Sequence, residues 1–321
     1  MNSELRSELL NLLREGISRR QILENVPLSR YTTLKLGGPA DILIEVGSVE
    51  QIRHAFAAAA DKDVPITVIG RGSNLLVRDG GLRGICLHMG DDFSEIITPQ
   101  PLPDGRIQVT AQSGASLQKL CNTAADAGLS GLEFAAGIPG TVGGAVYMNA
   151  GAYGGQMSDC VFEVRLINYQ GQEETLSNEE MHFDYRYSVL MERDDFPIVT
   201  EITFVLSPRD SDTVYTAMRE FNNKRREKQP VHLPSCGSTF KRPSGYFAGT
   251  LIEECGLKGY RVGGCSVSTQ HAGFLVNDQN GTAEDYEILM RQVRDTVKQK
   301  TGVLLEPEVR VIGDERALQD Q

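Results

Sequence analysis

Two glycine-rich stretches decide the fold of this chain: Gly70-Arg71-Gly72-Ser73-Asn74, followed by Leu75, and Gly137-Ile-Pro-Gly-Thr-Val-Gly-Gly-Ala145, which continues to Gly155. The second stretch places seven glycines within nineteen residues. Each glycine costs backbone entropy on folding, and an ordinary core does not require so many. Two such loops on one chain therefore suit a long ligand that contains a diphosphate.

The first stretch follows a predicted strand at residues 65–69, and its successive N–H groups are suited to an anion-binding nest. It does not match the known nucleotide-binding motifs. Leu75 stands where the dinucleotide-fold fingerprint has its third glycine, and Gly80-Gly81 comes before a helix could form. The Gly-Lys-Ser/Thr of a phosphate-binding P-loop is also missing. A tight turn between two strands is the alternative interpretation.

For the second stretch the alternative is a flexible linker. Apolar residues interleave with the glycines, which is unusual for a linker. They are Ile138, Val142, Val146, Tyr147 and Met148. This pattern favours a packed loop over a linker.

The composition limits the possible partners. The 321 residues are enough for two or three domains, and the 40% hydrophobic and 23% charged content is typical of a globular protein. A formal net charge of −11 argues against nucleic-acid and anionic-membrane partners, because like charges repel. The six cysteines form no C-x-x-C pair, so we expect no metal site and no disulfide framework.

The polar N-terminus does not resemble a secretory signal, and no stretch approaches the roughly 18 apolar residues of a membrane span. We therefore expect a cytoplasmic protein that is not inserted in a membrane.

Apolar spacing predicts the elements in chain order. Residues 4–25 suggest one or two helices. A strand at 41–46, a helix opened by the capping box Ser48-x-x-Gln51, and a second strand at 65–69 form a βαβ unit. Strands then dominate, which points to an α+β domain. The remaining predictions are strands at 84–88, 106–111, 161–168, 198–206, 261–267 and 303–312, and helices at 116–127, 213–226, 247–254 and 282–302.

Five separated motifs resemble one family, the UDP-N-acetylenolpyruvoylglucosamine reductases (UDP-N-acetylmuramate dehydrogenases). The resemblance runs from Thr32 to Arg310, nearly the whole chain. It looks like the shorter form of the family, which lacks a tyrosine-bearing loop over the substrate. The motifs are Gly70-Arg-Gly-Ser-Asn-Leu-Leu76, Ala136-Gly-Ile-Pro-Gly-Thr-Val-Gly-Gly-Ala145, Tyr185-Arg-Tyr-Ser188, Cys236-Gly-Ser-Thr-Phe-Lys-Arg-Pro243 and His271-Ala-Gly-Phe-Leu-Val-Asn277.

The resemblance implies an α+β fold with three domains: an FAD-binding fold of the vanillyl-alcohol-oxidase (PCMH) type and a C-terminal α/β substrate domain. We expect residues 1–85 with 304–321 to form the first FAD-binding subdomain and 86–212 the second, and 213–303 to bind substrate. The residues expected to bind FAD are Gly70, Arg71, Gly72, Ser73, Asn74, Leu75, Gly137, Thr141, Gly143, Gly144 and Gly151.

The implied reaction is reduction of the enolpyruvyl ether of a UDP-sugar, with NADPH as co-substrate, in peptidoglycan precursor synthesis for the cell wall. Such a reduction needs a hydride donor, a group that stabilises the enolate, and a proton source. The family motifs give Ser238 as proton donor, Arg186 as the partner of the substrate carboxylate, and Glu308 as an assisting acid. Spacing alone does not separate Glu306 from Glu308, because alternation puts both on one face.

Each of these candidate residues also has an ordinary structural interpretation. Ser238 could be a turn hydroxyl, Arg186 a surface ion-pair residue, and His271 a packed core histidine. Cys236 beside Ser238 could suggest a nucleophile, but the reaction needs no covalent intermediate. The basic cluster at 224–228 suits a solvated helix or a nucleotide diphosphate.

Two other functions remain open from the sequence: a flavin oxidase or dehydrogenase of a hydroxy acid or sugar lactone, and a flavin-binding regulator without turnover. We expect a monomer.

Overall fold

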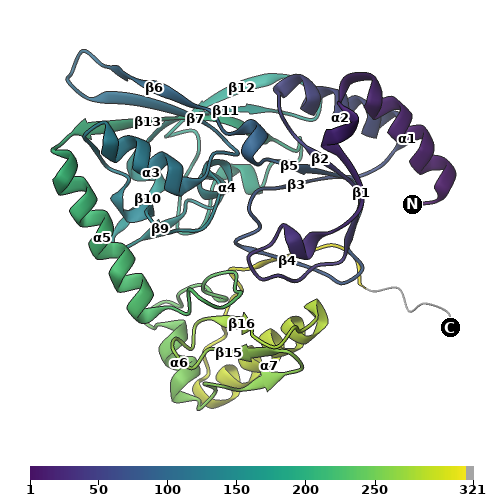
Figure 1. Ribbon diagram of the computed structural model, residues 1–321. Coiled ribbons are helices and arrows are strands. Elements are labelled where there is room, and N and C mark those ends of the chain that lie inside the picture. Colours follow the sequence, from purple (N-terminus) through teal and green to yellow (C-terminus); the bar gives the residue numbers. More distant parts are fainter. Residues whose placement is uncertain (316–321) are drawn as a thin grey trace. The chain divides into compact units, whose positions relative to one another are not determined.

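The computed structural model describes residues 1–315, so residues 316–321 of the predicted first subdomain lie outside it (Figure 1). The chain folds into two compact units. Unit 1 comprises Met1–Leu23, Leu43–Arg71 and Ile85–Lys224, and unit 2 comprises Glu24–Ile42, Gly72–Gly84 and the chain from Arg225 onward.

The N-terminal region forms two helices of unit 1, α1 (Ser3–Gly16) and α2 (Val49–Lys62). Helix α1 buries a leucine face, and α2 begins where predicted because Ser48 Oγ accepts a hydrogen bond from the Gln51 N–H at 3.3 Å. The expectation of helix up to residue 25 is wrong at its end. Residues 22–27 form strand β1 (Ile22–Pro27) instead.

A four-stranded sheet has the order β1-β2-β5-β3, with β2 at Pro39–Glu45, β3 at Ile66–Ile69 and β5 at Leu82–His88. Strands β3 and β5 are parallel. Strand β5 lies between the two strands of the predicted βαβ unit. Each of β1, β2 and β5 begins in one unit and ends in the other.

The main sheet of unit 1 has the order β12-β11-β13-β7-β6, and β8 pairs with β13 (Figure 1). The neighbouring strands of this sheet pair in antiparallel fashion. The apolar faces of α3 (Leu117–Asp126) and α4 (Val142–Tyr147) belong to the same core cluster as the sheet. The strands are β6 (Ile96–Pro101), β7 (Ile107–Gln112), β8 (Leu129–Ser130), β11 (Val161–Ile167), β12 (Glu173–Ser177) and β13 (Ile198–Pro208).

This sheet confirms the predicted strands at 106–111, 161–168 and 198–206 and the helix at 116–127. Strand β6 was not predicted. It contains Pro99 and Pro101, which a sheet accepts at its edge because proline has no N–H for the ladder. Strand β6 is at the edge.

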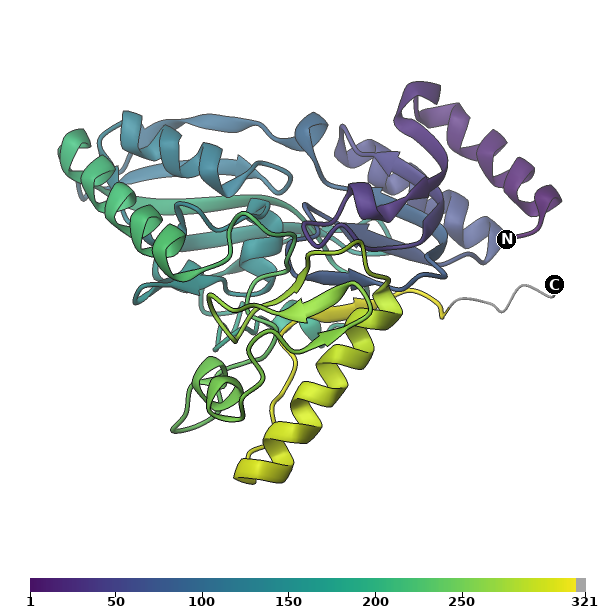
Figure 2. The ribbon, with the colours of Figure 1, turned by 60° about the horizontal axis from the view of Figure 1, so that its bottom comes forward.

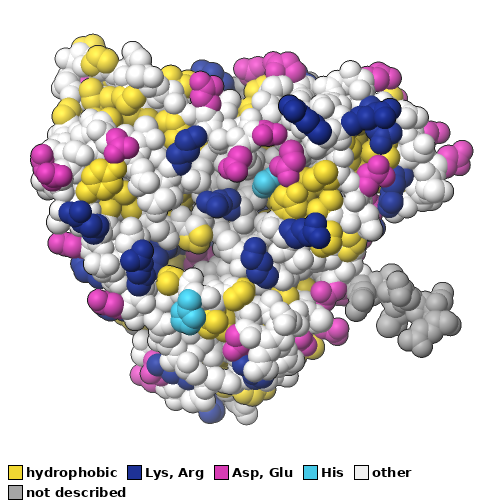
Figure 3. Space-filling model, viewed as in Figure 1, with side chains coloured by type: hydrophobic (Ala, Val, Ile, Leu, Met, Phe, Trp, Pro, Cys, Tyr) yellow, Lys and Arg dark blue, Asp and Glu magenta, His cyan; other side chains and the backbone are white. Residues whose placement is uncertain are grey.

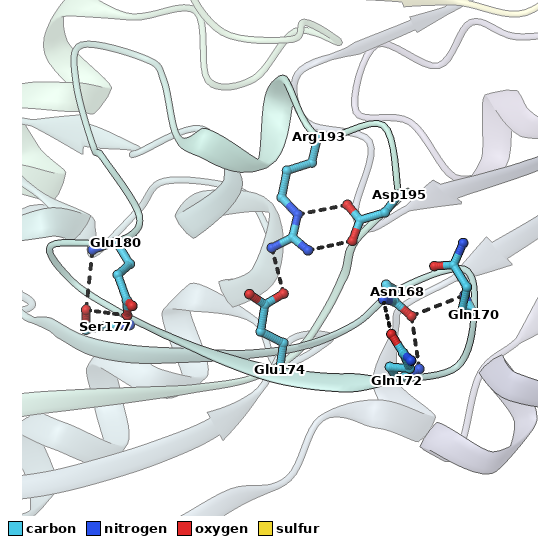
Figure 4. Close-up of polar contacts among 8 residues, drawn as sticks. All are labelled: Asn168, Gln170, Gln172, Glu174, Ser177, Glu180, Arg193 and Asp195. Atoms are coloured by element: carbon cyan, nitrogen blue, oxygen red, sulfur yellow. Dashed lines mark hydrogen bonds and ion pairs between the residues drawn. The ribbon is translucent and has the colours of Figure 1, made fainter.

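The segment between β12 and β13 carries Arg186, and polar contacts fix both of its ends (Figure 4). At its start, the Glu180 carboxylate accepts hydrogen bonds from the Ser177 N–H at 2.8 Å and its hydroxyl at 2.7 Å. At its end, the Arg193 guanidinium pairs with Asp195 and, at 2.7 Å, with Glu174. The pKa of the Asp195 carboxyl is lowered, chiefly by its hydrogen bonds from Arg193.

Unit 2 packs helix α7 (Ala283–Thr301) on a small sheet with the order β14-β15-β16 (Figure 2). The predicted start and end of α7 are confirmed: Thr282 and Asp285 form a capping box, and Gly302 ends the helix at φ 76°. The predicted strand 261–267 is wrong as a single strand. It is a hairpin of β14 (Arg261–Val262) and β15 (Cys265–Val267), and β16 spans Leu275–Asn277.

The end of the chain returns to the first glycine stretch. Strand β17 (Arg310–Ile312) pairs in parallel with β4 (Leu75–Val77) within unit 2. The predicted strand 303–312 is thus much shorter than expected. As predicted, no helix follows the first glycine stretch; the stretch leads into β4, a strand that was not predicted.

The remaining helices are α5 (Ser211–Lys228) and α6 (Ala248–Glu254), and a short hairpin joins β9 (Gly151–Ala152) to β10 (Gly155–Gln156). On the face drawn in Figure 3, basic and acidic side chains are interspersed. Within residues 1–315 no helix is both long and apolar enough to cross a bilayer, and no group of His, Cys, Asp and Glu is placed to hold a metal ion.

All six cysteines are buried free thiols, and burial raises the pKa of Cys121, Cys236 and Cys265 to about 12. We predict that the native protein reacts very slowly with dithiobis(nitrobenzoate) at about pH 8, because all six thiols are buried and the raised pKa of Cys121, Cys236 and Cys265 keeps their reactive thiolate scarce. In urea all six thiols should react. Released thionitrobenzoate is measured by absorbance.

A Thr98→Cys variant, altered at an exposed position of β6, provides the control and should release one equivalent rapidly without denaturant. Rapid labelling of the unaltered native protein would contradict the buried placement of the thiols.

Candidate active site

The two glycine stretches meet within unit 1. A side chain at Gly70 would overlap Thr141 Oγ1, so the backbone at the end of β3 packs directly on Thr141. The Thr141 side chain is buried and accepts a hydrogen bond from the Gly144 N–H at 3.3 Å, which begins helix α4. The predicted FAD contacts Gly70, Thr141 and Gly144 therefore lie together.

Backbone hydrogen bonding distinguishes the two stretches. At the start of α4, the N–H groups of Val142 and Gly143 already donate to the carbonyls of Ala115 and Ser113, both at 2.8 Å. In the part of the chain that the structure describes, the amides of residues 70–74 donate to no backbone carbonyl. The first stretch is therefore the better candidate for an anion-binding nest. A nest needs a left-handed residue next to a right-handed one, and Gly72 at φ 58° has the left-handed conformation.

One buried hydroxyl lacks a partner beside the second stretch. Ser113 Oγ is in a side chain that is only 2% exposed and has no hydrogen-bond partner among the described residues. A Cβ at Gly143 would come within 2.6 Å of Ser113 Cβ, so the glycine keeps this space open. A buried unsatisfied hydroxyl is costly, and a bound polar ligand would satisfy it. These residues fit a phosphate-bearing cofactor such as FAD.

Arg186 is at the tip of a tight turn in unit 1. The backbones of Asp184 and Tyr187 exchange hydrogen bonds at 3.2 and 3.1 Å, and Arg186 between them has φ 54°. The guanidinium donates from Nη2 to the Gly151 carbonyl at 2.9 Å and from Nη1 to the Asn149 carbonyl at 3.4 Å. Arg186 thus contacts the second glycine stretch directly.

Asn149 holds the Arg186 turn through its side chain as well. It is 1% exposed, and its Nδ2 donates to the Asp184 carbonyl at 3.0 Å while its Oδ1 accepts from the Ser158 N–H at 3.0 Å. Its φ of 40° is one that asparagine tolerates better than most residues. The structure therefore adds Asn149 to the candidate site; in the sequence, its place in the glycine-rich stretch was the only indication of this role.

In unit 2 the first glycine stretch contacts the segment that holds Glu308. Asn74 Nδ2 donates to the Glu308 carbonyl at 3.0 Å, and the Arg310 N–H donates to the Asn74 carbonyl at 3.1 Å. These bonds precede the β4–β17 pairing. Of the predicted residues, Asn74 thus contacts Glu308 directly, and Leu75 pairs with Arg310 in this unit.

Ser238 lies next to the same segment. Its neighbour Thr239 accepts a hydrogen bond from the Glu308 N–H at 2.9 Å through its carbonyl, and Phe240 forms an antiparallel bridge with Pro307. The Ser238 side chain is exposed, whereas Thr239 is fully buried. Ser238 and Glu308 therefore lie on two neighbouring backbone segments that this hydrogen bond and this bridge join.

The two glutamates that spacing alone could not separate differ in the structure. Glu306 is exposed and its carboxylate pairs with Lys241 Nζ at 2.5 Å. Glu308 is half-buried, and its charge contributes to the raised pKa of the buried Cys236 thiol after the larger effect of burial. The two glutamates therefore differ in exposure and in their partners.

Three other residues from the sequence have structural explanations. His271 Nδ1 accepts from the Gly273 N–H at 3.1 Å, and burial lowers its pKa. Cys236 is buried with a raised pKa, which does not suit a nucleophile. In the basic cluster, Lys224 Nζ lies 5.6 Å from the Phe221 ring centroid.

The remaining residues predicted to bind FAD, Arg71, Gly137 and Gly151, belong to unit 1.

Comparisons with known proteins identify the family and the fold class of the chain. A family model for the C-terminal domain of UDP-N-acetylenolpyruvoylglucosamine reductase matches residues 229–312, and one for an FAD-binding domain matches residues 40–177, which confirms the predicted fold class. Two relatives bear the name UDP-N-acetylenolpyruvoylglucosamine reductase. That of Lactobacillus delbrueckii subsp. bulgaricus is 44% identical over 96% of this chain and 100% of its own length, and that of Exiguobacterium sibiricum is 45% identical over 96% and 98%.

The crystal structure of UDP-N-acetylenolpyruvylglucosamine reductase from Thermus caldophilus has a TM-score of 0.73 at 35% identity, covering 89% of this chain and 97% of that chain. The chain belongs to the UDP-N-acetylenolpyruvoylglucosamine reductase family.

Proposed function

We propose that this chain catalyses the NADPH-dependent, FAD-mediated reduction of UDP-N-acetylglucosamine enolpyruvate to UDP-N-acetylmuramate, a step of peptidoglycan precursor synthesis in the cytoplasm. The observation that carries the proposal is the near full-length match to reductases of this name at 44–45% identity. Within unit 1 the contact of Arg186 with the second glycine stretch supports it, and within unit 2 so does the position of Ser238 beside the segment that holds Glu308.

The proposal is tested by the visible spectrum. Purified protein should be yellow, lose its colour with NADPH under anaerobic conditions, and recover it when the enolpyruvyl sugar nucleotide is added. A colourless protein that cannot be reconstituted with FAD would contradict the proposal, and fast recovery with oxygen but none with the sugar nucleotide would favour an oxidase.

We propose that FAD is held by residues 70–75 and by Gly137, Thr141, Gly143, Gly144 and Gly151. Bound there, it supplies the hydride chemistry between NADPH and the enolpyruvyl double bond. The open amides of residues 70–74 and the unpartnered Ser113 hydroxyl support this placement.

Arg186 is proposed to bind the substrate carboxylate. A guanidinium presents several N–H donors in one plane, and two of them already donate to fixed carbonyls. This fixes the orientation of the group before substrate arrives. As charge develops on the enolate, the positive charge of Arg186 stabilises it without reorganisation.

Ser238 is proposed to donate the proton to the carbon that bears the carboxylate. A hydroxyl is a weak acid, so its contribution depends on close placement beside the carbanion. Glu308 lies on the neighbouring backbone segment, where its N–H donates to the carbonyl of Thr239, the residue after Ser238. Glu308 is proposed to assist this proton delivery. We further propose that residues 213–303 bind the substrate and that the enzyme is a monomer.

Ser238→Ala should leave flavin reduction by NADPH within about twofold and slow flavin reoxidation by the enolpyruvyl substrate by about a hundredfold or more. The hydroxyl is needed only when the substrate carbanion is protonated. Stopped-flow absorbance of the flavin measures both half-reactions. Ser244→Ala, at an exposed serine of the same unit, is the control and should change neither. Equal losses in both half-reactions would remove Ser238 from the proton-donor role.

Asn149→Gly should slow reoxidation by substrate by about tenfold, because it removes a buried hydrogen bond to the Arg186 turn while glycine accepts the left-handed backbone. The substrate KM should rise, and flavin reduction should change little. Asn178→Ala is the matched control, since its amide also bonds to the Ser158 region but not to the Arg186 turn. If both variants lose the same activity, Asn149 acts on general stability instead.

A further inference from the structure

The outer surface of the turn at Gly237-Ser238 has few neighbours that could hold it in position. Gly237 has φ 80°, and a Cβ added there would meet no atom within 4 Å. The Ser238 side chain is exposed. The position of its hydroxyl therefore depends on the residues on either side of Gly237-Ser238.

Those neighbours are buried and are joined by one side chain. Cys236 is 2% exposed and Thr239 is fully buried. The hydroxyl of Tyr286, a fully buried residue in the first turns of α7, lies 3.1 Å from Cys236 Sγ and 3.1 Å from Thr239 Oγ1. A single phenol thus contacts both ends of the Ser238 turn from the interior of unit 2.

The hydrogen bonds have one direction that satisfies every hydroxyl. The Leu275 N–H donates to Thr239 Oγ1 at 3.2 Å. The Thr239 hydroxyl can then donate to Tyr286 Oη, and the Tyr286 hydroxyl to Cys236 Sγ. In the reverse direction the Thr239 proton would need another acceptor. A chain of this kind, enclosed in an apolar core, is rigid because breaking any bond leaves a buried polar group unpaired.

The same chain of hydrogen bonds is also connected, through Thr239, to the backbone of Glu308. The Thr239 backbone donates to the Gly273 carbonyl at 2.9 Å and accepts from the Glu308 N–H at 2.9 Å. A shift of Thr239 would therefore displace both Ser238, its neighbour in the chain, and the backbone of Glu308.

We propose that Tyr286 is a positioning residue for the reduction: its hydroxyl fixes Cys236 and Thr239 and so holds the Ser238 hydroxyl where the proton is delivered. This rests on the proposed function, because it presupposes that Ser238 is the proton donor. Tyr286 acts through the turn and makes no contact with substrate.

The test is Tyr286→Phe, which removes one oxygen and keeps the ring that fills the core. Flavin reoxidation by the enolpyruvyl substrate should slow by about tenfold, while flavin reduction by NADPH and substrate KM change less than about twofold. Tyr260→Phe is the matched control: its hydroxyl donates to Gln292 of the same helix at 2.6 Å and lies outside this chain of bonds. It should leave both half-reactions unchanged.

A second pair of variants keeps the proposal falsifiable if Tyr286→Phe folds poorly. Thr239→Val removes the hydroxyl at similar volume and should reproduce the selective loss, whereas Thr239→Ser keeps the hydroxyl and should restore reoxidation. In the Ser238→Ala background, Tyr286→Phe should cause no further loss, because the group it positions is gone.

Additive losses in that double variant, or equal losses in both half-reactions of Tyr286→Phe, would overturn the role of Tyr286. If Ser238→Ala itself has no selective effect on reoxidation, the proposed function of Ser238 fails first, so the two failures are distinguishable.

Discussion

The parallel pairing of β17 with β4 is the interaction on which the candidate site of unit 2 depends. It joins residues more than two hundred positions apart, Arg310 to Leu75, and the bonds between Asn74 and the Glu308–Arg310 backbone extend it. Closing so long a loop is entropically unfavourable, so a short strand pair needs support from packing. Leu76 is fully buried in the same apolar cluster as Leu305 and Val309, which provides that support.

This pairing explains why the first glycine stretch is followed by a strand. A helix after Gly72 would have prevented residues 75–77 from pairing with β17. The stretch instead turns at Gly72–Asn74 and enters β4, and the Asn74 side-chain amide donates to the Glu308 carbonyl. The same backbone segment therefore has amides that donate to no backbone carbonyl among the described residues and also bonds to the backbone of a candidate acid.

The sequence predicted what is encoded locally. The capping residues Ser48 and Thr282 and the terminal glycine Gly302 specify helix ends through bonds within a few residues, and the structure has them. Edge strand β6 and the hairpin at 261–267 escaped prediction, since the first contains two prolines and the second needs only Gly263-Gly264 to turn. The motif residues of the site came from resemblance and not from periodicity.

Residues whose role arises from distant contacts could not be predicted. Tyr286 occupies a core position of an amphipathic helix, and its spacing with Leu289 and Val293 gives no sign that its hydroxyl reaches Cys236 and Thr239. Ser113 is likewise an ordinary serine after a strand. Only tertiary packing shows that the hydroxyl of Ser113 lacks a partner and that the hydroxyl of Tyr286 has two.

The two proposed catalytic turns follow one physical scheme. Arg186 has a positive φ itself, and Ser238 follows Gly237, which has one. A positive φ costs free energy at Arg186 and persists only where its surroundings determine it, whereas Gly237 adopts such a backbone without strain. In each case a buried polar side chain bonds to residues near the proposed catalytic group: Asn149 to the Asp184 carbonyl, two residues before the half-buried Arg186, and Tyr286 to Cys236 and Thr239, on either side of the turn of the exposed Ser238. The reactive side chains can thus remain accessible to substrate while their positions are set from the interior, where hydrogen bonds are protected from competing water.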